Sequence, residues 1–174
     1  MTRGAEVGDA PVAAGPGEVP RGDDDVVLDP DTRADALIAI RRALEEDLRY
    51  GPDATSLATV PADAWATARL ASRGDGVVAG LPLIEMVLSE VLGSGGAGSG
   101  NSGSGGPGSV DSAGYTVTLH AADGDRVSAG EVVAEISAPT LGLLTAERTL
   151  LNLVCHLSGV ATLTRAWADE LAGT

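Results

Sequence analysis

An apolar stretch at residues 145–164, TAERTLLNLVCHLSGVATLT, limits the folds open to this chain because a helix of this composition needs cover on most sides. At about 100° per residue, its residues fall on two distinct sides. The apolar side carries Leu150, Leu153, Val154, Leu157, Val160 and Ala161. The opposite strip is small and polar and carries Arg148, Asn152, Cys155, Gly159 and Thr162. We therefore predict a packed helix whose polar strip faces another backbone or a ligand.

Arg148 is the charged residue of that strip, and it stands beside Glu147 at the expected start of the helix. A guanidinium on an apolar helix is most often the partner of a carboxylate elsewhere in the fold, and spacing alone favours this ion pair. Alternatively, its planar fork of donors binds a carboxylate or phosphate at two points, helped by the positive potential of a helix N-terminus. The residue pattern leaves both interpretations open.

The charge and composition of the chain exclude several classes of function. The formal net charge is −14, and no lysine accompanies the 11 arginines, so nucleic acid is not an expected partner. The single Cys155 cannot form an internal disulfide, and two histidines are too few for the usual metal-site motifs. We expect Cys155 to be a buried thiol. No segment resembles a membrane span or a signal peptide, so we expect a cytoplasmic protein without membrane contact.

The N-terminal third combines a polar leader with an amphipathic helix. Residues 1–26 are rich in Gly, Pro, Ala and Asp without an apolar period, which predicts a disordered leader. The helix is expected to be capped by Asp31 or Thr32 and to end at Gly51. We expect its acidic end, residues 45–47, either to be held by arginines or backbone donors or to be solvated. Its apolar face carries Leu37, Ile40, Leu44 and Leu48.

The middle of the chain alternates short strands with one more helix. Strands are predicted at residues 66–72 and 76–80, and a helix from Pro82 to near Leu92. Alternation at residues 115–120 and 131–136 predicts two half-buried strands, with His120 exposed. Residues 93–114 are Gly- and Ser-rich and predict a surface loop that extends a hairpin. They do not form a phosphate-binding P-loop, which ends in Gly-Lys-Ser/Thr.

Five segments, in the same order along the chain, resemble the quinolinate phosphoribosyltransferase family. ERTLLN and LSGVATLT in residues 147–164 resemble its E-R-T-x-L-N and L-S-G-[IV]-A-T motifs. EDLRYGPDATS in residues 46–56 resembles E-D-L-x-x-G-D-x-T, with Pro52 as one extra residue. Residues 60–63, residues 76–81 and residues 123–131 also match. The resemblance covers residues 35–174, apart from the Gly/Ser-rich insertion at 93–114.

A second family shares part of this pattern. Residues 124–136 also resemble the barrel-sandwich fold of biotinyl and lipoyl carrier domains. A carrier domain attaches its cofactor to a lysine, and this chain has none, so the carrier function is excluded. A non-catalytic barrel-sandwich binding or interaction module remains an alternative, as does a related pyridine phosphoribosyltransferase.

The resemblance to quinolinate phosphoribosyltransferase implies an α+β fold, with a barrel-sandwich or hammerhead-like N-terminal domain followed by the first helix leading into an α/β-barrel. We expect residues 27–144 to form the N-terminal domain. Residues 145–174 are then the linking helix and the start of a catalytic barrel that lies beyond them. We expect the sequence to be the N-terminal fragment of this enzyme, without activity of its own.

The same resemblance implies a reaction and a set of partners. Quinolinate and phosphoribosyl pyrophosphate give nicotinate mononucleotide, pyrophosphate and CO₂, with Mg²⁺ held by the barrel. Arg148 corresponds to the residue that binds the pyridine dicarboxylate across a homodimer interface, while Glu147 and Asn152 are supporting residues. A homodimer or larger homo-oligomer is implied. We expect neither catalytic residues nor metal ligands within this chain.

Overall fold

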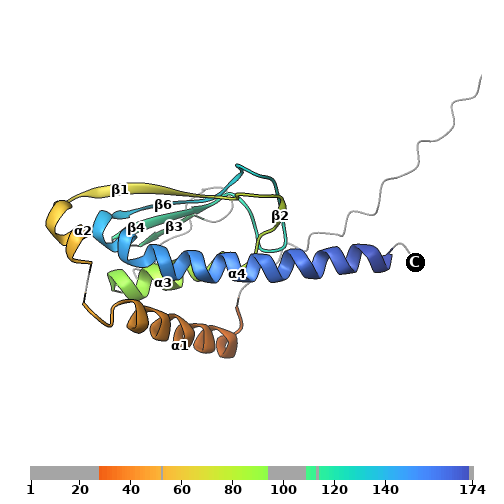
Figure 1. The fold of residues 1–174 in the computed structure, drawn as a ribbon, viewed down its shortest axis with the longest axis horizontal. Helices are drawn as coiled ribbons and strands as arrows, with labels where there is room; N and C mark the ends of the chain where they lie inside the picture. The colour runs from red at the N-terminus through yellow and green to blue at the C-terminus, as the bar shows by residue number, and fades with distance from the viewer. Residues whose placement is uncertain (1–27, 52, 94–108, 113, 173–174) are drawn as a thin grey trace, which may run out of the picture.

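The computed structural model describes residues 28–51, 53–93, 109–112 and 114–172, and their elements are shown in Figure 1. The predicted leader at residues 1–26 and most of the Gly/Ser-rich insertion lie outside the described residues. Helices and strands are mixed in one α+β fold, as expected. In chain order they are α1 (Pro30–Asp47), α2 (Ala54–Thr59), β1 (Trp65–Ala71), β2 (Gly76–Val77), α3 (Pro82–Leu92), β3 (Ser109–Ser112), β4 (Tyr115–Leu119), β5 (Arg126–Val127), β6 (Val132–Pro139) and α4 (Thr140–Ala172).

The main sheet has four antiparallel strands in the order β1-β6-β4-β3, and β2 pairs with β5 in a small second sheet. On β6, Ile136 lies opposite Ala68 of β1 and Val117 of β4. The outer face is polar: Trp65 and Thr67 donate hydrogen bonds to the Ser137 hydroxyl. The sheet therefore buries one face only, as the predicted alternation of its strands requires.

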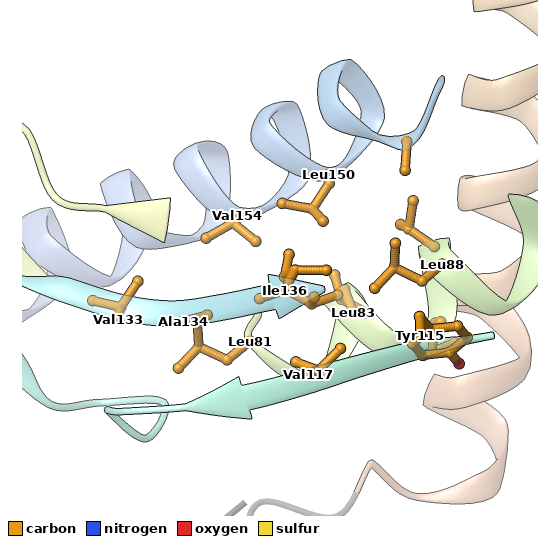
Figure 2. Packing of buried hydrophobic residues seen from close by; sticks show 14 of the residues in the cluster. Leu81, Leu83, Leu88, Tyr115, Val117, Val133, Ala134, Ile136, Leu150 and Val154 are labelled. Carbon is orange, nitrogen blue, oxygen red and sulfur yellow. The ribbon is translucent and has the colours of Figure 1, made fainter. Parts of the chain in front are cut away.

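Helices α3 and α4 cover the apolar face of the sheet (Figure 1). Figure 2 shows Leu150 and Val154 of α4 above Ile136 of β6. Leu83 and Leu88 of α3 belong to the same buried cluster, together with Leu81, which precedes α3. Helix α1 packs against α3 and α4 on the side away from the sheet, through Ile40 and Leu44. The core is thus a sheet, a helix layer and one outer helix.

The start of α1 differs from the prediction by two residues. Asp29, and not Asp31 or Thr32, is the N-cap residue, and its carboxylate accepts hydrogen bonds from the backbone N–H groups of Asp31 and Thr32. Hydrogen bonds from Thr32 lower the pKa of Asp29 below its ordinary value. Pro30 occupies the first helical turn, where a missing N–H costs nothing. The D-P-D-T order offers three potential caps, and proline selects the first.

The long helix α4 begins at Thr140, so the predicted start at Thr145 was wrong. Strand β6 runs directly into α4: Pro139 still pairs with Trp65, and the Thr140 N–H donates to the Ala64 carbonyl. Gly142, a residue that is unfavourable in the interior of a helix, lies within this segment. Gly142 is buried where α4 packs closely against α3, and a Cβ added there would lie 2.2 Å from Cδ2 of Leu92. No helix in the described part of the chain is long and apolar enough to cross a membrane.

Two strand predictions also need correction. Residues 109–112, inside the stretch predicted as a loop, form β3 and pair with β4. Residues 76–80 were predicted as a strand, but β2 ends at Val77. Beyond it, the Ala79 N–H donates to Ser158 and the Gly80 N–H to Asp123, so these groups are bound by side chains and not by a neighbouring strand.

Candidate functional site

Arg148 lies more than two turns into α4, eight residues after Thr140. The expected help from a helix N-terminus therefore does not apply, because that potential fades within the first turn. The Arg148 side chain is 77% exposed, and its Nη1 atom lies 3.7 Å from Oδ1 of Asp47. The predicted ion pair with a carboxylate elsewhere in the fold is confirmed, although the guanidinium is exposed and not buried.

Asp47 is the last residue of α1, and its other carboxylate oxygen is also engaged. The Thr149 hydroxyl donates to Oδ2 of Asp47 at 3.1 Å. Thr149 is only 1% exposed, while the Asp47 side chain is 24% exposed. Asp47 therefore joins α1 to α4 through one oxygen and faces Arg148 with the other. The acidic end of α1 is held here by a side-chain hydroxyl and an arginine, where an arginine or backbone donors were expected.

A cavity of about 240 Å³ opens beside this group. It brings together two segments that are far apart in sequence, because Arg148 and Thr145 of α4 meet residues around α2 and the end of α1. Leu48, Leu57 and Leu144 contribute exposed apolar surface to it. The complete lining is Asp47, Leu48, Gly51, Asp53, Ser56, Leu57, Leu141, Leu144, Thr145 and Arg148.

Asp53 places a second carboxylate in the lining of this cavity. It is the N-cap of α2, and its side chain accepts hydrogen bonds from the Ser56 hydroxyl at 2.6 Å and the Thr55 N–H at 2.9 Å. The bond from Ser56 is the main reason why the pKa of Asp53 falls below its ordinary value. Asp53 thus stays charged at neutral pH, and its oxygens are used for capping.

Glu147 and Asn152, the predicted supporting residues, are both exposed on α4. Within the described ranges, neither side chain takes part in a hydrogen bond or an ion pair. Asn152 follows Arg148 by one helical turn and so lies on the same face. The structure therefore leaves the roles of Glu147 and Asn152 as predictions.

The polar strip of α4 is packed at one end only. Cys155 and Gly159 are exposed, so the expectation of a buried thiol was wrong. Several residues of the predicted apolar side, among them Leu157 and Val160, are exposed as well. The reason is visible in Figure 1, where α4 continues past the end of the sheet and one small sheet covers one side of it.

Thr162, the last residue of the strip, faces another backbone as predicted. Its hydroxyl accepts a hydrogen bond from the Val77 N–H at 2.8 Å and also lies 3.4 Å from the Val77 carbonyl oxygen. One turn earlier, the Ser158 hydroxyl accepts from the Ala79 N–H at 3.0 Å and donates to the Ala79 carbonyl at 3.2 Å. These two hydroxyls dock the end of β2 onto α4. The L-S-G-V-A-T sequence therefore has a structural role in this chain.

A second, wider cavity of about 900 Å³ lies between the end of α1 and α3. Arg41 and Glu90 form a two-point ion pair in its wall, at 2.8 and 3.0 Å. Hydrogen bonding to Arg41 lowers the pKa of Glu90, and the same bond raises the pKa of Arg41. Arg42, Glu45 and Arg49 add charges of both signs to the lining, so this cavity selects no particular ligand charge.

Comparison with known proteins identifies the family. The family described as quinolinate phosphoribosyl transferase, N-terminal domain, matches residues 53–158, which is more than half of the chain. The chain belongs to this family. The nicotinate-nucleotide pyrophosphorylase of Mycobacterium leprae is 47% identical over 135 residues, which cover 78% of this chain and 41% of that protein. A quinolinate phosphoribosyltransferase of Nicotiana tabacum is 30% identical and covers 75% of this chain and 31% of that protein.

Solved structures agree with this membership of the quinolinate phosphoribosyltransferase family. NadC from Streptococcus pyogenes superposes with a TM-score of 0.66 at 29% identity and covers 84% of this chain and 44% of that one. The nicotinate-nucleotide pyrophosphorylase of Francisella tularensis, at 23% identity and a TM-score of 0.62, shows the same fold. The chain spans about two fifths of the length of its Mycobacterium leprae relative.

Asp47 and Thr149 were missed as site residues by the sequence analysis. Both stand in segments that carried the family resemblance, Asp47 in E-D-L and Thr149 in E-R-T. The contact between them could not be predicted, because 102 residues separate them in the chain. No group of three His, Cys, Asp or Glu side chains that could hold a metal ion occurs among the residues that the structure describes.

Proposed function

We propose that this chain supplies the N-terminal domain and linking helix of a quinolinate phosphoribosyltransferase. The complete enzyme would join the ring nitrogen of quinolinate to C1 of phosphoribosyl pyrophosphate, with loss of pyrophosphate and CO₂. The family match and the names of the relatives support this reaction. We assign residues 27–144 to a sandwich-like domain and residues 145–174 to the link toward an α/β-barrel. The proposed location is the cytoplasm, although relatives from plants include chloroplastic and mitochondrial forms.

The exposed guanidinium of Arg148 is the observation that carries the proposal. Quinolinate is a dicarboxylate, and an arginine fork can donate two parallel hydrogen bonds to one carboxylate. At 3.7 Å, Asp47 balances the charge of Arg148 without taking up a hydrogen-bond donor. We propose that Arg148 enters the active site of a partner subunit in a homodimer, with Glu147 and Asn152 beside it on the same exposed surface.

The leaving pyrophosphate calls for Mg²⁺ in the complete enzyme, where the ion would neutralise charge that develops as the bond to C1 breaks. The described residues offer no cluster of metal ligands, and we place the ligands in the barrel. The part of this chain is to bind and orient quinolinate through Arg148.

Substitution of Arg148 in the full-length enzyme tests this function. We expect Arg148→Ala to raise the KM for quinolinate about 10- to 100-fold, since losing charge-assisted hydrogen bonds costs about 1.5–3 kcal/mol. Arg148→Lys should restore only part of the affinity, because an ammonium lacks the fork. Steady-state kinetics with each substrate varied in turn provides the measurement.

Arg69→Ala is the matched control, since Arg69 is an exposed arginine paired with Glu135 on the outer face of the sheet. Unchanged kinetics for Arg148→Ala would disprove the substrate role. Full activity with nicotinate in place of quinolinate would favour a related pyridine phosphoribosyltransferase. The gene offers a second test: the hundred or so codons after Thr174 should encode an arginine-lysine pair at a strand end and acidic strands, whereas a binding module would end in a stop codon.

A further inference from the structure

We propose that Asp47 is a positioning residue for Arg148, and that the buried Thr149 hydroxyl holds Asp47 in place. The inference rests on the proposed function of Arg148 and adds to it. The end of α1 and the third turn of α4 meet at this point, with Asp47 between Thr149 and Arg148. The E-D-L and E-R-T segments would thus together orient the Arg148 side chain.

Thr149 fixes the carboxylate. It is the only buried polar or charged residue among those that the structure describes, with 1% of its surface exposed. A buried hydroxyl requires a hydrogen-bond partner, and Oδ2 of Asp47 provides it at 3.1 Å. Because α4 is packed against the sheet through Leu150 and Val154, Thr149 has a fixed position, and so does the oxygen that it binds.

The second oxygen of Asp47 faces the guanidinium. The distance of 3.7 Å between Oδ1 and Nη1 is an ion-pair contact, too long for a hydrogen bond. Asp47 therefore restricts where the long Arg148 side chain can go while its N–H donors remain available. A side chain that is already oriented loses less rotamer entropy when the ligand binds, which favours affinity.

The charge of Asp47 has an opposing effect, since a carboxylate near a dicarboxylate ligand repels it. The two effects change the affinity in opposite directions when Asp47 is removed. If positioning dominates, quinolinate binds more weakly, whereas if repulsion dominates, quinolinate binds more tightly. Because 77% of the long Arg148 side chain is exposed, little packing would hold it without Asp47, so we infer that positioning dominates.

The test uses the full-length enzyme with variants at both anchoring residues. Asp47→Asn keeps an oxygen for Thr149 but removes the attraction to Arg148, and Thr149→Val keeps the shape of residue 149 but removes its hydroxyl. We expect each to raise the KM for quinolinate about fivefold or more, with the KM for phosphoribosyl pyrophosphate within about twofold of the parent. Thr149→Ser should restore the parent value. Glu45→Gln is the matched control, an exposed carboxylate in the last turns of α1.

A double-mutant cycle separates positioning from general damage. In an Arg148→Ala background, Asp47→Asn should add less than about twofold, because the residue that it positions is gone. Thermal unfolding checks that the variants fold, and Asp47→Asn is isosteric. An unchanged or lowered KM for quinolinate in Asp47→Asn, or effects that add fully to those of Arg148→Ala, would overturn the inference. Failure of the underlying function looks different: Arg148→Ala itself would then leave the KM for quinolinate unchanged.

Discussion

Asp123 connects the loop after β4 to the segment between β2 and α3. Its two carboxylate oxygens accept hydrogen bonds from the backbone N–H groups of Gly80 at 2.8 Å and Leu81 at 2.9 Å. Leu81, the N-cap position of α3, has no capping side chain of its own. Asp123 therefore caps α3 from the loop between β4 and β5, a task that a neighbour in sequence performs in most helices.

Replacing Asp123 should destabilise the chain measurably. Asp123→Ala leaves two N–H groups at the start of α3 without a partner, and we expect a loss of about 1–3 kcal/mol in the free energy of unfolding. Asp123→Asn retains one acceptor oxygen, so its free energy of unfolding should lie between those of Asp123→Ala and the parent. Urea denaturation followed by circular dichroism gives the values. Asp63→Ala, at an exposed aspartate, should stay within about 0.5 kcal/mol of the parent, and an equal loss there would refute the capping account.

The Asp169 carboxylate makes part of the stability depend on pH. Hydrogen bonds from Arg126 and then Arg165 lower the pKa of Asp169 below its ordinary value of 3.8. A lowered pKa stabilises the fold above the ordinary value, and this contribution is lost as pH falls below 3.8 through the pKa of the folded state. The melting temperature of Asp169→Asn should therefore lie below that of the parent at neutral pH, and the two should converge in acid. A constant difference would contradict this.

At the scale of elements, the contact between α4 and β2 depends on two hydroxyls. Val77 is buried, and its N–H donates a hydrogen bond to the Thr162 hydroxyl. Thr162→Val removes the acceptor at nearly constant shape, and we expect a loss of about 1–3 kcal/mol together with faster amide exchange at Val77. Thr164→Val is the control, since that hydroxyl donates to the Val160 carbonyl of its own helix. Unaltered exchange at Val77 would show that β2 is held by other contacts.

Elements with a strong local pattern were predictable from the sequence. Pro82 and the apolar run after it defined α3 correctly, and alternation located β4 and β6. The start of α4 was not predictable, because Gly142 favours a loop until Leu92 of another helix is seen packed against it. The exposure of Cys155 escaped prediction for a related reason, since periodicity shows which residues share a face but not how far a sheet extends along it.

The candidate site was predictable in part. Arg148 and its need for a carboxylate followed from its position on an apolar helix, but the identity of Asp47 did not, because contacts between distant segments leave no local pattern. The same holds for Asp123 as the cap of α3. Family resemblance marked the segments that carry these residues without showing that they meet.

At the scale of the whole molecule, α4 extends beyond the two sheets (Figure 1). Its last turns carry Leu163, Trp167 and Leu171, which are 63%, 70% and 72% exposed. Asp169 bonds to Arg126 of β5 and so ties this end of the helix to the small sheet. Among the residues that the structure describes, the first half of α4 therefore packs against the core, while apolar side chains of its second half stay exposed.

We expect residues 1–174 alone to show no phosphoribosyl transfer. One arginine can orient a dicarboxylate, but it cannot stabilise the departing pyrophosphate without a metal ion and further cations. Release of pyrophosphate, measured with both substrates present, provides the assay, and the full-length enzyme is the positive control. Release by the isolated chain that depends on quinolinate would contradict the division of labour proposed above.

Because α4 is one continuous helix, the number of residues between two of its side chains fixes the angle between them. Arg148 and Ser158 lie ten residues apart on one uninterrupted helix, roughly 15 Å along its axis. One residue inserted between them would turn Arg148 by about 100° relative to β2 and carry it away from Asp47. The number of residues between these two points, which include the exposed Asn152 and Cys155, therefore sets the direction of Arg148 relative to β2. A change in that number would rotate the guanidinium that we propose binds quinolinate.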